Sequence, residues 1–549
     1  MLKSLVKYLK WLYRRSEGVR WPIAVNILLG SVTVGLNLLF IFLCKRMVDV
    51  ATGVHAGDLP VLAGVTIGVM ALRICISAYN VRLENLTRSR MEFIIRRGIY
   101  SELLQSRWTG RGGLHSGDAV NRIETDVSTV TNVICSELPS VFTTSLQLVA
   151  AAAFLFVMKW QLALVLVVLT PLLFVVSKVF FRKMRTLTRD NRDTESEVQS
   201  HIQESLRHKV VIQSLENASM MEDKLDTLQG TEYGQVVERT RFNIISRLIV
   251  SATFSFGYIA AFLWGAFGIW KGSTTFGMMT AFLQLVGQIQ RPAVNLTRQV
   301  PAFIYATASI DRLMELEQAP KEESGEQITL PSPAGVRFEN VTFRYPDGDE
   351  NVTENLSFDF APGSKTAIIG PTGAGKSTII RLILGLLSPT EGRVSLYSGT
   401  TGEQADASPM TRCNLVYVPQ GNTLFSGSVR DNLRMGDPDA SEERLREVLD
   451  LAEASFVHEL PEGMDTVCGE GGAGLSEGQA QRIAIARGLL RPGSIMLLDE
   501  FSSSLDPETE DRLMRNLTAR SGDKTMIFIT HRERIADFCG STLKIGQAP

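Results

Sequence analysis

The sequence predicts a multi-domain fold, in which an all-α transmembrane domain of six helices with long cytoplasmic extensions precedes an α/β domain. Three observations lead to this prediction. The chain has 549 residues, which is too long for a single domain with one hydrophobic core. Its apolar residues crowd into the N-terminal part. The C-terminal part alternates short β-rich runs with helical patterns and contains the glycine-rich segment Gly370–Ser377.

The spanning segments follow from apolar length. About 20 apolar residues are needed for a helix to cross the hydrocarbon core. The candidates are Pro22–Cys44, Leu59–Tyr79, Pro139–Met158, Leu162–Phe181, Leu248–Trp270 and Phe276–Gln290. The last is the weakest, because glutamines interrupt it. In lipid every backbone polar group needs an internal partner, so these segments are expected to be helices.

The distribution of basic residues predicts the orientation. The connections after the second and fourth spans carry Arg88, Arg90, Arg96, Arg97, Arg107 and Arg111, and Arg182, Lys183, Arg185, Arg189 and Arg192. The other loops are short and nearly bare. By the positive-inside rule, the N-terminus, both long connections and the C-terminal domain are cytoplasmic.

Both long connections are predicted to be helical, over Glu84–Gln105 and Arg185–Thr240, because apolar residues recur there at helical spacing. The spans would thus extend into the cytoplasm and turn near Gly110–Gly117 and Arg207–Leu215; two independent coiled-coil loops are the alternative. The first residues form a basic amphipathic pattern rather than a signal peptide. We expect a helix on the inner membrane face, with a soluble amphipathic helix as the alternative.

The predicted domain boundaries are 1–316 for the transmembrane domain, 317–334 for a proline-containing linker and 335–549 for the α/β domain. Within the α/β domain, strands are expected at Val336–Phe343, Lys365–Ile369, Asn414–Val418, Ile495–Leu498 and Thr525–Ile529. Their alternation with helices predicts a mainly parallel sheet.

Gly370-Pro-Thr-Gly-Ala-Gly-Lys-Ser377 matches the phosphate-binding pattern G-x-x-x-x-G-K-[ST], between a predicted strand and a helix at Ser377–Leu386. Its glycines let backbone N–H groups surround phosphates, and the helix N-terminus adds positive charge. Lys376 is expected to reach the β- and γ-phosphates and Ser377 to bind Mg²⁺. The alternative is a glycine-rich turn without function.

Two acids, Asp499 and Glu500, end the apolar strand that begins at Ser494. Asp499 is predicted to contribute to the Mg²⁺ shell, and Glu500 to orient or deprotonate the attacking water. Such acids alone would more often be a surface turn, but together with the phosphate loop they predict a hydrolytic site.

Leu475-Ser-Glu-Gly-Gln479, followed by Ala480–Arg487, resembles the signature motif of the ATP-binding cassette (ABC) transporter family. Further motifs match in the expected order. Gln420 resembles the Q-loop, His531 the switch histidine, Ser503–Asp506 the D-loop, Tyr345 the aromatic residue that stacks on adenine, and Thr466–Glu470 a segment by which exporters touch the membrane domain. The resemblance covers nearly the whole chain and implies an exporter-type half-transporter, whose α/β unit is an ABC ATPase.

The resemblance also implies ligands and partners. Two cassettes would close head to tail, each signature covering the nucleotide on its partner. ATP would contact Tyr345, Gly370, Pro371, Thr372, Gly373, Ala374, Gly375, Lys376, Ser377, Thr378, Ser476, Gly478 and Gln479. Ser377, Gln420 and Asp499 would hold Mg²⁺, and Glu500, His531 and Gln420 would be catalytic. The intact motifs favour a homodimer, with a heterodimer left open.

Two departures from the family pattern stand out. Glu477 replaces the usual glycine of the signature, and its charge would repel the γ-phosphate. Activity is expected to persist with a changed nucleotide affinity or cycle rate. Only residues 532–549 follow His531, so we expect either a minimal C-terminal lobe or a smaller interface with the partner.

The substrate is open between a lipid, a drug-like amphiphile and a peptide. Arg73 lies in the second span, where an ionisable residue is a functional candidate, although it could instead pair within the bundle. Gln284 and Gln288, with Met278 and Met279, predict a sixth helix that faces a cavity of mixed polarity.

The predicted function is ATP-driven export or flipping of such a substrate by alternating access, in a multi-pass protein of the bacterial plasma membrane. A membrane-anchored ATPase with a sensor role is the alternative. A P-loop kinase or a soluble DNA-acting ATPase would not explain six spans, and fusion of spans to a cassette disfavours an importer. The net charge of −2 gives no basic surface for nucleic acid. The six cysteines are scattered, without a C-x-x-C pair, which predicts neither a zinc site nor a disulfide framework.

Overall fold

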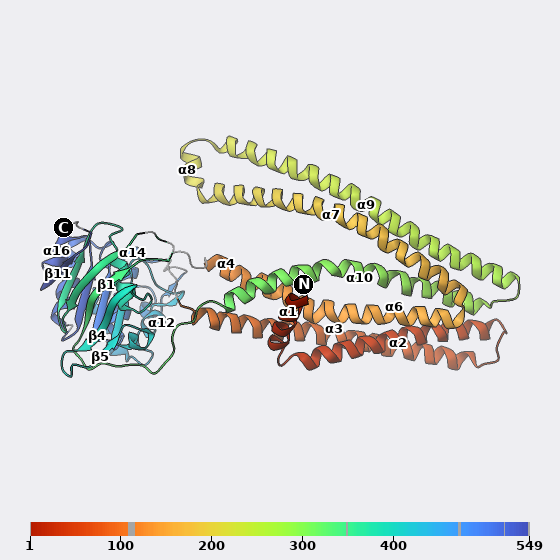
Figure 1. Cartoon of the computed structure of the whole chain (residues 1–549), viewed down its shortest axis with the longest axis horizontal. Helices are drawn as coiled ribbons and strands as arrows, with labels where there is room; N and C mark the ends of the chain where they lie inside the picture. The colour runs from red at the N-terminus through yellow and green to blue at the C-terminus, as the bar shows by residue number, and fades with distance from the viewer. Residues whose placement is uncertain are drawn as a thin grey trace. The chain divides into compact units, whose positions relative to one another are not determined.

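The computed structural model of the chain describes residues 2–107, 116–346, 348, 350–469, 474–520 and 522–546 (Figure 1). The chain divides into two compact units. The first comprises residues 1–101 and 116–317, and the second residues 102–115 and 318–549. The turn predicted at Gly110–Gly117 lies mostly outside the described residues, as do Arg111 and Glu470.

The first unit is entirely helical. Its elements are α1 (Leu2–Arg15), α2 (Arg20–Ala51), α3 (Leu59–Leu104, whose end belongs to the second unit), α4 (Ser116–Asn121), η1 (Arg122–Asp126), α5 (Val127–Asn132), η2 (Val133–Glu137), α6 (Leu138–Met158), α7 (Trp160–Arg207), α8 (Lys209–Ser214), α9 (Ala218–Trp270) and α10 (Phe276–Glu317). The segments η1 and η2 are π-helical turns.

The long helices confirm the predicted extensions beyond the apolar stretches. α3 continues from the second apolar stretch as one helix of 46 residues, and α7 and α9 have 48 and 53 residues. In Figure 1, α7 and α9 lie side by side and are joined by the short α8, close to the turn predicted at Arg207–Leu215. The two connections are therefore continuous with the spans and are not independent coiled coils.

Four helices of the described residues are long and apolar enough to cross a membrane. They cover Arg20–Ala51, Leu59–Leu104, Gly117–Met158 and Ala218–Trp270. The helices α7 and α10 occupy the places predicted for the fourth and sixth spans. The protein is thus a multi-pass membrane protein, and the count of six spans remains a prediction.

The helices α2, α6, α9 and α10 share an apolar core. Ile41, Leu155, Ala261 and Phe282 are buried in it, and the ring of Trp264 contacts Phe282 edge to face at 5.4 Å between centroids. Small residues such as Ala151 and Ala281 also lie in this core, which allows close helix approach. The first half of α10 packs against three other helices through this core.

The N-terminal helix α1 is confirmed, and its polar side chains reach the end of α10. Trp11 Nε1 and Arg14 Nη2 each donate to Glu317 Oε2 at 3.0 Å, and Arg15 Nη2 donates to Glu317 Oε1 at 2.6 Å. Tyr8 Oη donates to Asp311, which lies before Glu317 on the same helix. The carboxylate of Glu317 is therefore surrounded by donors, while a position of α1 on a membrane surface remains a prediction.

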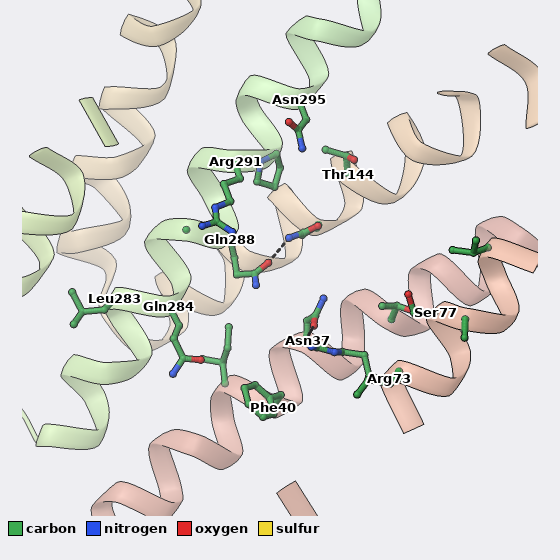
Figure 2. Close-up of a pocket in the computed structure, with 18 residues that line it drawn as sticks. Asn37, Phe40, Arg73, Ser77, Thr144, Leu283, Gln284, Gln288, Arg291 and Asn295 are labelled. Carbon is green, nitrogen blue, oxygen red and sulfur yellow. Dashed lines mark hydrogen bonds between the residues drawn. The ribbon is translucent and has the colours of Figure 1, made fainter. Parts of the chain in front are cut away.

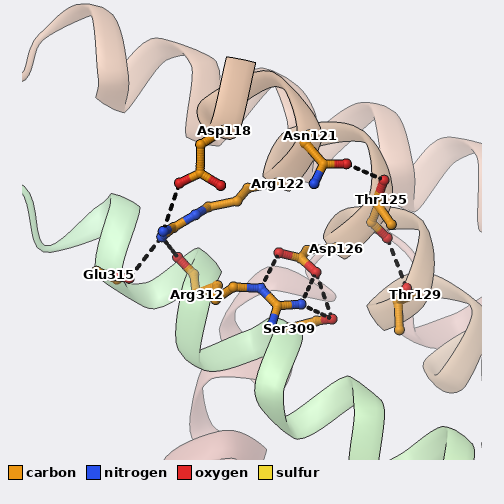
Figure 3. Close-up of polar contacts among 9 residues, drawn as sticks. All are labelled: Asp118, Asn121, Arg122, Thr125, Asp126, Thr129, Ser309, Arg312 and Glu315. Atoms are coloured by element: carbon orange, nitrogen blue, oxygen red, sulfur yellow. Dashed lines mark hydrogen bonds and ion pairs between the residues drawn. The ribbon is translucent and has the colours of Figure 1, made fainter. Parts of the chain in front are cut away.

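A polar network joins η1 to the second half of α10 (Figure 3). The buried carboxylate of Asp126 accepts from Arg312 Nε and from Ser309 Oγ, both at 2.8 Å. Next to it, Arg122 forms ion pairs with Asp118 at 2.9 Å and with Glu315 at 2.8 Å. Because the Asp126 side chain is only 6% exposed, these bonds compensate a desolvated charge.

We expect Asp126→Ala to destabilise this unit by about 1–3 kcal/mol, because Ser309 and Arg312 lose their shared acceptor. Thermal unfolding of the purified protein in detergent measures the effect. Asp118→Ala is the matched control, because its carboxylate is 46% exposed and should contribute little. Equal unfolding temperatures for the two variants would contradict a structural role for the Asp126 network.

The second unit contains two main sheets and a two-stranded one. Its strands are β1 (Ala334–Phe343), β2 (Thr353–Phe360), β3 (Lys365–Ile369), β4 (Glu391–Ser398), β5 (Gln404–Asp406), β6 (Leu415–Val418), β7 (Gly427–Ser428), β8 (Val467–Cys468), β9 (Ile495–Asp499), β10 (Thr525–Ile529) and β11 (Ser541–Lys544). Its helices are α11 (Lys376–Ile383), η3 (Pro409–Asn414), α12 (Val429–Arg434), α13 (Glu442–Leu451), η4 (Ser455–Glu459), η5 (Gly463–Asp465), α14 (Glu477–Leu490), α15 (Pro507–Arg520) and α16 (Glu533–Ala536).

The predicted parallel sheet is present, with strand order β11-β3-β10-β9-β6. The assignment of Val336–Phe343 to that sheet was wrong, because β1 lies in an antiparallel sheet of order β2-β1-β4-β5. A short connection follows β1, and short connections pair strands antiparallel, whereas a parallel neighbour needs a long crossover. The strands β2, β4, β5 and β11 were not predicted from the sequence.

The predicted linker packs on the second unit. Arg412 Nη1 and Nη2 donate to the two carboxylate oxygens of Glu322, both at 2.7 Å. Leu330 N donates to Asn414 Oδ1 at 2.8 Å. These contacts fix the segment that leads into β1 against the second unit.

Candidate functional site

The predicted site residues follow the carboxyl ends of four neighbouring parallel strands. The phosphate loop follows β3, the acid Glu500 follows β9, His531 comes shortly after β10, and Gln420 shortly after β6. Because parallel strands end at the same edge of a sheet, residues far apart in the sequence meet there. Ligands of open α/β sheets bind at this edge.

The phosphate loop adopts a conformation that depends on glycine. Gly373 and Gly375 have φ angles of 87° and 92°, a left-handed region that residues with a Cβ rarely adopt. Gly375 directly precedes α11, which begins at Lys376 and ends at Ile383, earlier than predicted. The loop therefore leads directly into the N-terminus of a helix, where backbone N–H groups lack intrahelical partners.

Lys376 is buried in this loop. Its Nζ donates to the carbonyl oxygens of Gly370 at 2.7 Å and Pro371 at 3.0 Å. Burial lowers the pKa of Lys376, and the negative charges of Glu500 and Asp499 oppose that shift. The ammonium group thus lies between the phosphate loop and the two acids.

Glu500 contacts the other two residues predicted to be catalytic, Gln420 and His531. Its Oε2 accepts from Gln420 Nε2 at 2.6 Å, and its Oε1 lies 2.7 Å from His531 Nε2. The same histidine nitrogen is 3.2 Å from Lys376 Nζ. Glu500 has a positive φ of 45°, which is strained for a residue with a side chain and typical of functional positions.

Asp499 and Ser377 form the group predicted to hold Mg²⁺. Burial, followed by the charge of Glu500, raises the pKa of Asp499, while a hydrogen bond from the Ser377 hydroxyl lowers it. Hydroxyl and carboxylate oxygens are suitable Mg²⁺ ligands, and such sites use few protein ligands beside phosphate and water. The residues therefore fit a Mg²⁺ site whose remaining ligands would come from ATP and water.

Tyr417 and Gln481 approach the site and were not predicted. Tyr417 Oη lies 3.5 Å from Asp499 Oδ2, and burial raises the pKa of this tyrosine to about 12. Gln481 is fully buried, donates to the Glu500 carbonyl at 3.3 Å and accepts from Ser504 Oγ at 2.8 Å. In the sequence, Gln481 stands out only because it lies on a helix face that is otherwise rich in alanine and isoleucine.

Tyr345 lies beside the first turn of α11. Its hydroxyl is 3.1 Å from Thr378 Oγ1 and accepts from Arg381 Nη1 at 3.0 Å. Its ring contacts Phe343 edge to face, with 5.0 Å between centroids. These contacts hold the aromatic ring next to the phosphate loop, and adenine stacking remains a prediction.

The signature residues form the N-terminus of α14. Ser476 Oγ accepts from Gln479 N at 3.2 Å, and Gln479 Oε1 accepts from Ser476 N at 2.9 Å, a reciprocal capping box. A Cβ at Gly478 would lie 2.8 Å from the Ser504 carbonyl oxygen, so this position requires glycine. Glu477 is exposed in the first turn.

In the described part of the chain, no hydrogen bond joins Ser476, Gly478 or Gln479 to the phosphate loop. The fold thus gathers the loop, Glu500, Gln420 and His531 at one sheet edge through direct contacts. It leaves the signature outside that contact network.

A second site lies in the helical unit. A cavity of about 910 Å³ is bordered by α2, α3, α6 and α10, with Arg73, Gln284 and Gln288 among its lining residues (Figure 2). Gln288 accepts a hydrogen bond from Gln147 of α6. The predicted cavity of mixed polarity is therefore present. Met278 instead packs against the apolar core of the bundle and does not line the cavity.

A phosphate loop and two acids at the edge of a parallel sheet, in a chain that also carries membrane-spanning helices, define an ATP-driven membrane transporter. The chain belongs to the ABC transporter family. Residues 23–293 match the ABC transporter transmembrane region, and residues 353–503 match the family model described as ABC transporter. The chain is therefore an ATP hydrolase coupled to transport.

Individual relatives support an exporter. A putative multidrug export ATP-binding/permease protein of Bacillus subtilis is 27% identical, covering 93% of this chain and 90% of that protein. The ATP-dependent lipid A-core flippase of Haemophilus influenzae is 27% identical, covering 93% and 89%. A bacterial Atm1-family ABC exporter with ATP bound has the same fold, with a TM-score of 0.77, 23% identity and coverage of 97% and 94%.

Proposed function

We propose that the chain exports or flips an amphipathic substrate across a bacterial plasma membrane, as a dimer that works by alternating access. The convergence of Lys376, Glu500, Gln420 and His531 at one sheet edge carries the proposal. In this proposal, one chain carries both the nucleotide-hydrolysing centre and the spanning helices. The N-terminus and the ATPase domain are proposed to be cytoplasmic.

Dimerisation would complete the nucleotide site. The signature residues lie outside the contact network of the phosphate loop, and Ser476 and Glu477 are exposed. In the proposed dimer, Ser476, Gly478 and Gln479 of each chain cover the phosphates bound by the other. Both sites of a homodimer would be competent, which favours a homodimer over a heterodimer.

The residues of the site have separable roles in this proposal. The loop from Gly370 to Ser377 surrounds the phosphates, and Lys376 leaves its carbonyl partners to contact the β- and γ-phosphates. Tyr345, whose hydroxyl lies next to that of Thr378, would stack on the adenine base. Glu500 accepts a proton from the attacking water or orients it, and His531 and Gln420 hold its carboxylate in position.

Ser377, Asp499 and Gln420 would hold Mg²⁺, which, when bound, neutralises charge on the phosphate oxygens. Tyr417 and Ser377 both form hydrogen bonds to the Asp499 carboxylate. The direction of the Asp499 pKa shift reflects burial next to Glu500. Opposite charge from a cation in this position favours the ionised form of both acids.

Glu477→Gly is expected to lower the KM for ATP by about fivefold or less, because it removes a negative charge that would face the partner's γ-phosphate. The difference should shrink at high ionic strength, which screens exposed charges. ATPase kinetics at low and high salt measure it. Glu443→Gly is the matched control, since it removes an exposed acid from the first turn of α13. A KM shift equal in the two variants would contradict a role for Glu477 at the nucleotide.

The proposed function is tested by ATP-driven uptake into inverted membrane vesicles, screened across lipids, dyes and peptides. Uptake of at least one cargo that requires ATP, together with stimulation of ATPase activity by that cargo, is the expected result. ATPase activity without flux of any cargo would contradict export and favour a membrane-anchored sensor ATPase.

A further inference from the structure

We propose that the cavity among α2, α3, α6 and α10 binds the anionic head group of an amphiphile, with Arg73 and Arg291 as its cationic contacts. The proposal rests on the export function proposed above and names the chemical class of its substrate. Figure 2 shows both arginines with the amide side chains that share the cavity.

The charge of the cavity lining is one-sided. Arg73 and Arg291 are its charged residues, and no Asp or Glu is among the described residues that line it. Its uncharged polar groups include side-chain amides, namely Asn37, Gln147, Gln284, Gln288 and Asn295. A volume of about 910 Å³ is within the range of small-molecule binding sites. The cavity therefore offers two positive charges and several hydrogen-bonding groups to one ligand.

Arg73 is positioned by neutral neighbours. Its Nη1 donates to Asn37 Oδ1 at 2.7 Å, and its guanidinium carbon lies 5.8 Å from the centre of the Phe40 ring. Both neighbours belong to α2 and neither carries a charge. An arginine has five N–H donors in a planar fork, so donors remain for a ligand. The contact with Asn37 thus orients Arg73, and no described acidic residue forms an ion pair with it.

Arg291 has even fewer contacts. It forms no hydrogen bond and no ion pair with any described residue of the chain, and it is exposed at the cavity. Gln284, Gln288 and Arg291 are spaced four and three residues apart on α10, which places them on one face of that helix. This polar face forms one wall of the cavity, and its cation is available to a ligand.

Arg73 lies within the second predicted span, where a cation without a counter-charge is costly because the surroundings have a low dielectric constant. An anion bound between the two arginines would offset this cost through charge-assisted hydrogen bonds. Phosphate and carboxylate both match the geometry of an arginine fork. A cationic ligand would instead add a third positive charge to the same space.

A neighbouring cavity has the opposite charge. Asn295 also lines a cavity of about 420 Å³, whose charged residues are Glu84 and Glu137. Within the described residues, neither acid forms an ion pair with Arg73 or Arg291. An anionic head group would be repelled from these acids and attracted to the arginines. The charges of the two cavities would thus direct the anionic head group to the cavity that contains the arginines.

The site is tested by direct binding to the full-length, nucleotide-free protein in nanodiscs of zwitterionic lipid. The probes are octyl phosphate, octyltrimethylammonium and inorganic phosphate, compared by equilibrium titration. Octyl phosphate is expected to bind about tenfold or more tightly than either of the others. Arg73→Gln and Arg291→Gln should each weaken octyl phosphate binding by about tenfold. Lys271→Gln, which removes an exposed positive charge after α9, is the matched control and should bind as the wild type does.

Octyltrimethylammonium binding as tight as that of octyl phosphate would overturn the proposal, and so would unchanged octyl phosphate binding in both arginine variants. Equal binding of inorganic phosphate would show a site for free anions and would also overturn it. The comparison of probes on the wild-type protein needs no variant, so poor folding of a variant does not prevent a decision. Binding is measured without ATP. A failure to transport any cargo would therefore contradict the proposed export function and would leave the proposed anion-binding site standing.

Discussion

Glu500→Gln is expected to reduce ATP turnover by about 10²–10⁴-fold while ATP binding persists, because general-base catalysis contributes a factor of this size. The substitution keeps the size of the side chain and removes its negative charge. A glutamine in this place can still contact Gln420 and His531, which lie 2.6 and 2.7 Å from the present carboxylate. The geometry of the nucleotide pocket should therefore survive.

Phosphate release and equilibrium binding of a fluorescent ATP analogue, measured on the same preparation, separate the two effects for this variant. Glu508→Gln is the matched control, since this exposed acid of α15 pairs with Arg512 and has no contact with the site. It should hydrolyse ATP at the wild-type rate. Turnover by Glu500→Gln within about twofold of the wild type would remove Glu500 from the role of base, since a lost base costs far more.

Lys376→Ala is expected to weaken ATP binding by about tenfold or more and to abolish transport, because a charged donor to the phosphates is lost. The present bonds of Lys376 to Gly370 and Pro371 show that its ammonium group already lies within the loop. Removing it also leaves Glu500 and Asp499 without the cation that lies between them and the loop. Both effects act on the phosphates of ATP.

ATP titration and ATP-driven uptake measure the effects of Lys376→Ala. Lys544→Ala provides the control, because this lysine is exposed on the edge strand β11. Thermal unfolding without nucleotide distinguishes a lost phosphate contact from a loosened fold. Cargo movement by Lys376→Ala at the wild-type rate would contradict coupling of this nucleotide site to transport.

Much of the ATPase site could be predicted because its residues follow from local chain properties. Gly373 and Gly375 adopt left-handed conformations that favour glycine, and Gly375 is one of the glycines that the phosphate-binding pattern specifies. Asp499 and Glu500 stand at the end of a short apolar run, a pattern that is visible without any knowledge of neighbouring strands. Their roles in catalysis remain predictions, while their positions agree with those roles.

The strand pairing of the antiparallel sheet could not be predicted in the same way. In β2, Thr353–Phe360, only the two end residues are buried, and the strand contains several polar residues. The pattern of β1 alone is compatible with either kind of sheet. The contacts with β2 and β4 decide it, and they depend on the connections around β1 rather than on its own residues.

The sequence by itself determined the two-part organisation, the helical form of the spans and their extensions, and the position of the phosphate loop. These features follow from apolar length, periodicity and backbone conformation, which neighbouring residues set. Only the tertiary structure decided which distant groups meet. Gln481 reaches Glu500, Asp126 meets Arg312, and Arg73 shares a cavity with Arg291. The reason is physical: such contacts depend on how helices and strands pack, and packing is set by all elements together.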